Sequence, residues 1–149
     1  MGSFTMEYEL FKPVVTYFEQ RRCLVASEVR IGFCRADLVA FHQNHQVSAV
    51  ELKLADWKKA IVQAKNYQLG ADYVYLAFPE KKCSLVLKRA ENTLRKQGIG
   101  LLAVDEQTQT IDVLISSRIS SNKFGTITTD EVWAQKVGYD SRRQIKHRK

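Results

Sequence analysis

A chain of 149 residues in which 45% of the side chains are hydrophobic is long enough to bury one sizeable core. No apolar run approaches the roughly 20 residues of a membrane-spanning helix, so we expect a soluble, cytoplasmic protein with no membrane partner. The formal net charge of +7 favours an anionic partner, nucleic acid first, although more than half of that excess lies in residues 139–149.

The first half of the chain predicts one helix and three short strands. Residues 5–22 carry apolar side chains three and four apart, which predicts an amphipathic helix that Pro13 either kinks or begins. The strands are expected at residues 24–31, 38–41 and 47–54. The turn before the last strand carries His42 and His45, which are not spaced with any cysteine as a zinc site and should be exposed. Tight connections between consecutive strands predict an antiparallel meander.

The second half predicts alternating helices and strands. Asp56 is a suitable N-cap for a helix that ends at Gly70. The later elements are expected to be a strand at 72–78, a helix at 84–97, strands at 99–104 and 111–115, a loop at 116–126 and a helix at 128–137. A helix between two strands makes the strand after it parallel to a neighbour. The sequence thus predicts an α/β domain over residues 1–138, with a central mixed sheet flanked by helices, and a basic tail over 139–149.

Two acidic residues and a lysine are predicted to meet at one edge of this sheet. Asp37 opens the second strand, and Glu51 and Lys53 end the third. Side chains two apart on a strand point to the same face, and the start of one antiparallel strand lies beside the end of the next. We therefore expect these three side chains to lie together, with Leu52 facing the core. A plain ion pair between Glu51 and Lys53 is the structural alternative.

The arrangement resembles the PD-(D/E)xK nuclease superfamily, which has the restriction-endonuclease-like fold. Members carry an acidic residue at the start of one core strand and an acid-x-Lys triplet on the next, as Asp37 and Glu51-Leu52-Lys53 do here. The resemblance covers the first half of the chain well and the remainder loosely. Ala36 stands where the motif has proline. That proline carries no metal, so the departure leaves the expected ligands unchanged.

Further positions match more variable parts of the family pattern. A RecB-like branch carries Gln-x-x-x-Tyr on the helix after the triplet, which Gln63 and Tyr67 fit. There they would position water or the DNA backbone, although an ordinary half-buried helix face would show the same spacing. Many members also have a glutamate on the first helix, which Glu7 could match, with Glu9 and Glu19 as competitors. Glu28 is a further acid near the expected site or a simple edge charge.

The resemblance implies a Mg²⁺- or Mn²⁺-dependent nuclease that hydrolyses the phosphodiester bonds of DNA, in repair, recombination or restriction. Mg²⁺ prefers oxygen ligands and is usually held by one or two carboxylates with waters and phosphate oxygens. The ligands implied are Asp37, Glu51 and the backbone carbonyl of Leu52, with Glu7 as a further candidate. Lys53 would orient the attacking water and offset developing negative charge.

Two other functions stay open at this point: a non-cleaving nucleic-acid-binding member of the same fold, and a structural or protein-interaction domain whose acids form ion pairs. Lys58, Arg142 and Arg143 are candidate contacts to phosphates. A compact domain of this size needs a partner to cut both strands together, and symmetry makes a homodimer the simplest one. The sequence contains no element that reads bases, so the nucleic acid itself is not specified.

Overall fold

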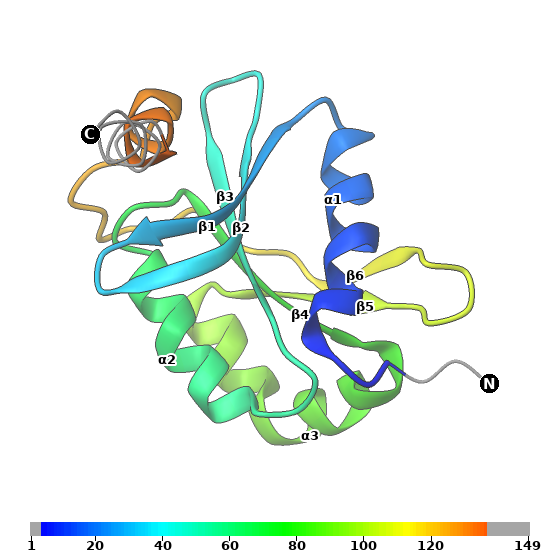
Figure 1. The fold of residues 1–149 in the computed structure, drawn as a ribbon. Helices are drawn as coiled ribbons and strands as arrows, with labels where there is room; N and C mark the ends of the chain where they lie inside the picture. The colour runs from blue at the N-terminus through cyan, green and yellow to red at the C-terminus, as the bar shows by residue number, and fades with distance from the viewer. Residues whose placement is uncertain (1–3, 137–149) are drawn as a thin grey trace, which may run out of the picture.

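Residues 4–136 are described by the computed structural model, and they build one six-stranded mixed sheet with helices on both faces (Figure 1). The basic tail with Arg142 and Arg143, and the predicted end of the last helix, lie outside the described residues. The elements in chain order are η1 (Glu7–Leu10), α1 (Phe11–Glu19), β1 (Leu24–Ile31), β2 (Cys34–Phe41), β3 (Val47–Leu52), α2 (Trp57–Tyr67), β4 (Tyr73–Pro79), α3 (Glu80–Gln97), β5 (Gly100–Val104) and β6 (Ile111–Ile115).

The strands follow one another across the sheet in chain order, from β1 to β6. The first three form the predicted antiparallel meander. The crossover through α2 makes β4 parallel to β3, and that through α3 makes β5 parallel to β4, while β6 pairs antiparallel with β5. The mixed α/β architecture predicted from the sequence is therefore confirmed.

The second and third strands differ from the prediction in a way that matters for the site. β2 begins at Cys34 instead of residue 38, because its first half continues beyond β3 and pairs with β1 alone. Asp37, which was predicted to open this strand, consequently lies in its middle. β3 ends at Leu52, two residues earlier than expected. The result is a two-stranded arm, residues 28–37, that extends past the end of β3.

The helix boundaries differ at their ends. The first helix was predicted over 5–22, but a 3₁₀ turn, η1, precedes α1, and α1 ends at Glu19. Pro13 lies in the first turn of α1, where a helix has no intrahelical partner for its N–H. α3 begins at Glu80, directly after Pro79 and before the predicted residue 84.

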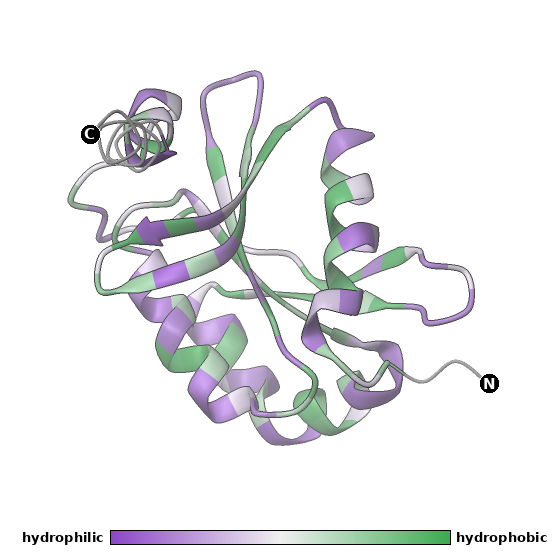
Figure 2. Cartoon of the chain, in the orientation of Figure 1, coloured by the Kyte–Doolittle hydropathy of each residue, from purple (hydrophilic) through white to green (hydrophobic). Residues whose placement is uncertain are grey.

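The sheet buries apolar residues on both faces. α2 and α3 pack on one face through Ile61, Ala64, Val86 and Leu94, and α1 packs on the other through Val14 and Phe18. Hydrophobic and hydrophilic residues are interspersed along all three helices, as amphipathic helices require (Figure 2). In residues 4–136, no helix has the length and apolar character needed to cross a membrane.

The segment after β6 returns across the sheet and is fixed by Asp72. This carboxylate, 4% exposed, accepts the Val47 N–H at 2.8 Å and pairs with Lys123, while the Asp72 carbonyl accepts the Ser120 N–H at 2.7 Å. The predicted loop is therefore ordered through one buried acid at the start of β4.

A last helix over residues 129–136 covers the free edge of β1. The Thr128 hydroxyl accepts the Glu131 N–H at 3.1 Å and so caps this helix. Gln135 Nε2 donates to the Arg30 carbonyl at 3.4 Å, and Lys136 Nζ donates to the Ser27 carbonyl at 2.9 Å. Side chains thus satisfy backbone groups that an edge strand leaves unpaired.

Replacing Asp72 with alanine should lower the free energy of unfolding by about 2–3 kcal/mol, because it removes a buried acceptor and leaves Lys123 without its counter-charge. Urea unfolding measures the change. Glu91→Ala is the matched control, since its ion pair with Arg95 is exposed and such pairs contribute less than about 1 kcal/mol. Equal losses of unfolding free energy in the two variants would show that the buried contacts of Asp72 contribute no more than an exposed ion pair.

Candidate functional site

The strand register brings Asp37 opposite Glu51. β2 and β3 are paired as far as Leu38 and Val50, and one further step in the same register aligns the two acids. Beyond that step the strands part, and the Leu52 N–H donates to Asp37 Oδ2 at 2.8 Å. Because β2 and β3 separate at this point, the Leu52 N–H is available to hold the Asp37 carboxylate in place.

Glu51 is enclosed by two further side chains of the predicted site. Lys53 Nζ lies 3.6 Å from Glu51 Oε2, and the Tyr67 hydroxyl lies 2.6 Å from Glu51 Oε1. The same hydroxyl lies 2.9 Å from the Arg35 carbonyl. It has one proton to donate, and a charged carboxylate is the stronger acceptor of the two. Glu51 is 4% exposed and Lys53 is 9% exposed. The predicted meeting of Asp37, Glu51 and Lys53 is confirmed, and Tyr67 joins them from α2.

Burial sets the protonation of this cluster. It raises the pKa of Glu51 to about 7, against the stabilising hydrogen bond from Tyr67. Burial also raises the pKa of Asp37, against the Leu52 N–H and a hydrogen bond with Glu51. The pKa of Tyr67 is raised by its own burial and then by Glu51, so its hydroxyl keeps its proton and acts as a donor. Glu51 therefore exchanges a proton with solvent near neutral pH.

A small cavity of about 250 Å³ lies on the other side of Asp37, between η1 and β1. Its lining comprises Glu7, Tyr8, Phe11, Ser27, Glu28, Asp37 and Leu52. Glu9 is occupied as a cap, since its carboxylate accepts the Met6 N–H at 2.8 Å, which leaves Glu7 as the acid of η1 facing the cavity. Glu28 lies opposite Asp37 in the β1–β2 register and has a φ of 53°, the left-handed region that side chains rarely adopt.

Gln63 carries a buried oxygen with an unmet hydrogen bond. Its Oε1 has no partner within residues 4–136, although buried acceptors are nearly always paired. Gln63 lies one helical turn before Tyr67, on the same face of α2, as predicted. Tyr67 is fully buried and Gln63 is half-buried, so this face of α2 packs toward the core at Tyr67. A bound water or ion would satisfy the Gln63 oxygen.

These residues fit a divalent cation held by few protein ligands. In the described residues, no group of three or more acidic, histidine or cysteine side chains is close enough to hold a metal. Asp37 and Glu51 supply two carboxylates, and waters and phosphate oxygens would complete the sphere, as is usual for Mg²⁺. Glu7 lines the neighbouring cavity, so its role as a ligand stays a prediction, as does that of the Leu52 carbonyl. Lys58 is exposed on α2, with Nζ 5.6 Å from the Trp57 ring centre.

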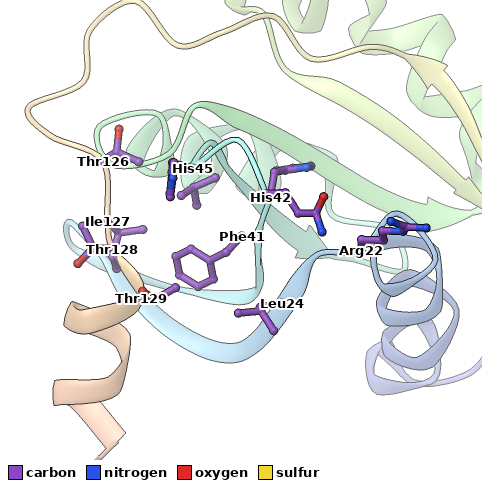
Figure 3. A pocket seen from close by; sticks show the side chains of 11 residues that line it. Arg22, Leu24, Phe41, His42, His45, Thr126, Ile127, Thr128 and Thr129 are labelled. Carbon is purple, nitrogen blue, oxygen red and sulfur yellow. The ribbon is translucent and has the colours of Figure 1, made fainter.

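A larger cavity of about 550 Å³ lies at the opposite end of β2 and β3 (Figure 3). His42, expected to be exposed, is half-buried there because its ring bridges Cys23 Sγ at 3.3 Å and Ser48 Oγ at 2.8 Å. Burial lowers the pKa of His42, which keeps the ring neutral. His45 is exposed, as predicted. The cavity lining carries no acidic residue, so it offers no second carboxylate site.

No family model matches this chain, and no curated protein matches it either. Among solved structures it is similar to SPO1766, a protein of unknown function from Silicibacter pomeroyi. The TM-score is 0.63 at 14% sequence identity, over 96% of this chain and 91% of that chain. Similarity at this level of identity shows a shared fold.

The stability of the protein should fall as the pH rises through about 7, because folding raises the pKa of Glu51 from its usual 4.5. The folded state then retains a proton that the unfolded chain releases, and the stabilisation present at low pH is lost at high pH. Urea unfolding at about pH 5.5 and about pH 8.5 measures this change. Glu51→Gln should flatten it, and Tyr67→Phe should move its midpoint upward. An unchanged slope in Glu51→Gln would rule out Glu51 as the titrating group.

Proposed function

We propose that this chain is a Mg²⁺- or Mn²⁺-dependent nuclease of the PD-(D/E)xK type, with the restriction-endonuclease-like topology, that hydrolyses phosphodiester bonds of DNA. The observation that carries the proposal is the buried contact between Asp37 and Glu51, beside Lys53 and under the Tyr67 hydroxyl. These residues come from β2, the end of β3 and α2, so three elements contribute to one point.

Charge distinguishes this cluster from an ordinary ion pair. The carboxyl group of the buried Glu51 contacts that of the half-buried Asp37, and Lys53 can neutralise only one of them. The remaining negative charge requires either a proton or a cation in a site from which water is largely removed. A structural ion pair between Glu51 and Lys53 would need neither Asp37 nor Tyr67. The excess of acid over base therefore favours a cation-binding role.

Asp37 and Glu51 would hold the cation, which lowers the pKa of a bound water and stabilises negative charge on the phosphate. Each neighbouring residue has a role that its contacts support. The Leu52 N–H orients Asp37, and the Tyr67 hydroxyl orients Glu51. Lys53 places a positive charge beside Glu51, where it can orient the attacking water and offset charge that develops on the phosphate.

The order of elements supports the same proposal. An acid on β2 is followed by the acid-x-Lys triplet at the end of β3, by a helix with the Gln-x-x-x-Tyr spacing and by β4 parallel to β3. Because α2 connects β3 to β4, it packs on the sheet and brings Tyr67 to the point where β2 and β3 separate. The Gln63 oxygen on this helix is buried without a partner, so a bound water or ion there would satisfy it.

Mg²⁺ or Mn²⁺ should stabilise the protein at about pH 8 by about 1–3 kcal/mol when in large excess over its dissociation constant. Thermal unfolding with and without the metal measures this. Asp37→Asn should abolish the gain, whereas Glu19→Gln, at an exposed acid on α1, should retain it. Because the proton competes for Glu51, the gain should shrink below about pH 7. An equal gain in wild type and Asp37→Asn would place the metal elsewhere.

Cleavage should be detected with Mg²⁺ or Mn²⁺ on at least one substrate in a panel of linear, branched, supercoiled and single-stranded DNA and RNA. Lys53→Ala should lower the rate by at least about 100-fold, because a positioned proton-transfer or charge-stabilising group contributes that much. Lys88→Ala, at an exposed lysine on α3, should leave the rate unchanged.

The other outcomes of this panel are equally specific. Salt-dependent binding without hydrolysis, unaffected by Lys53→Ala, would identify a non-cleaving nucleic-acid-binding protein. Absence of both metal binding and nucleic-acid binding would point to an interaction domain and end the nuclease proposal.

A further inference from the structure

Phe33 and Phe124 expose almost their whole side chains to solvent. They are 89% and 93% exposed, more than any other large hydrophobic residue in the described chain. Both line one cavity of about 410 Å³, although they are far apart in sequence. Phe33 is at the turn between β1 and β2, and Phe124 is in the segment after β6. Exposed apolar side chains that gather at one cavity indicate a binding surface.

The backbones of both phenylalanines are hydrogen-bonded to the last turn of α2 or to the turn that follows it. The Phe33 N–H donates to Asn66 Oδ1 at 3.0 Å, and the Phe124 N–H donates to the Leu69 carbonyl at 3.0 Å. Asn66 is half-buried, and its amide also donates to the Ile31 carbonyl at 2.6 Å. Their backbone is thus fixed while their rings stay in solvent, which suits a preorganised contact surface.

Gly32 makes this arrangement possible at the tip of the arm. It has a φ of 62°, and a Cβ built on it would lie 2.5 Å from Asn66 Oδ1. Only glycine allows the turn and the approach of Asn66 together. The hairpin tip is therefore built to rest on α2 next to Tyr67, whose hydroxyl contacts Glu51.

The arm connects this surface to the carboxylates. Phe33 precedes Asp37 by four residues, which is about 13 Å at about 3.3 Å per residue. Arg30 and Arg35 are a directly opposed, exposed pair between these two points. Neither guanidinium has an ion-pair partner within residues 4–136.

Opposed like charges destabilise a strand pair, so an anion bound at this pair would stabilise the arm. The one acidic residue in the cavity lining, Glu131, is engaged with the Thr128 hydroxyl at 3.3 Å. Aromatic rings beside unpaired arginines match the two parts of a nucleotide, a stackable base and a phosphate. A purely apolar partner would use the phenylalanines and leave Arg30 and Arg35 uncompensated.

We propose that Phe33 and Phe124 form a stacking platform for unpaired nucleobases, with Arg30 and Arg35 holding the phosphates that lead toward Asp37. The substrate class would then be single-stranded or locally unpaired nucleic acid, because bases inside a duplex already stack on each other. The assignment of a substrate rests on the proposed function, but the binding itself does not require cleavage.

Binding of the full-length chain to a fluorescently labelled single-stranded oligonucleotide and to its duplex, in EDTA, tests the platform without hydrolysis. Phe33→Ala and Phe124→Ala should each weaken single-strand binding by about tenfold, the effect expected for one stacked base, and duplex binding by less than about twofold. Leu85→Ala, at an exposed leucine on α3, should change neither. Melting temperatures should match wild type, because the rings lie in solvent. Fluorescence quenching of 2-aminopurine in the oligonucleotide should report stacking and disappear in the variants.

Equal losses for single strand and duplex, or no loss for either, would overturn the platform. Loss of self-association in Phe33→Ala without loss of single-strand binding would instead make this surface an interface between copies of the chain. The two proposals fail separately. If bases stack on the phenylalanines but no DNA or RNA is cleaved with either metal, the nuclease proposal is refuted and the platform stands. If single strands are cleaved at the same rate by wild type and by both phenylalanine variants, the platform is refuted and the nuclease proposal stands.

Discussion

The contact between the buried carboxyl group of Glu51 and the half-buried one of Asp37, with one ammonium group beside them, is the constraint on which the candidate site depends. Asp37 and Glu51 are neighbours because β2 and β3 share a register up to the point where they part. Burial then makes their ionisation unfavourable and raises both pKa values. A folded protein tolerates such a pair when a proton or a cation takes up the excess charge. This property links the fold to the proposed binding of a cation.

α2 links the carboxylates to the exposed arm. Its last turn places the Tyr67 hydroxyl on Glu51 and the Asn66 amide on the hairpin tip. A change in how α2 packs on the sheet would therefore affect the carboxylates and the two phenylalanines together. The side-chain hydrogen bonds from the last helix to β1 restrain the same arm from its outer edge. Contacts with α2 and with the last helix thus hold the arm, which has no pairing with β3.

Much of the site could be predicted from local patterns. The alternation of side chains along β3 and the antiparallel turn before it were enough to bring Asp37, Glu51 and Lys53 together. The four-residue spacing on α2 predicted that Gln63 and Tyr67 share a face. Other features left no local signal. The length of β2 depends on its partner strand, and the half-burial of His42 depends on Cys23 and Ser48. Phe33 and Phe124 are exposed because little of the described chain packs over their side chains.

The sequence by itself determined the order and type of the elements, the mixed sheet and the residues that meet at the end of β3, because periodicity and short connections are local properties. Tertiary structure decided where β2 leaves β3, and hence that Asp37 lies inside a longer strand. It also decided the protonation of the carboxylates, since a pKa depends on how much water the surrounding elements exclude. The join between the hairpin and α2 likewise required the fold, because Gly32 and Asn66 are far apart in the chain and meet only when the helix packs on the sheet.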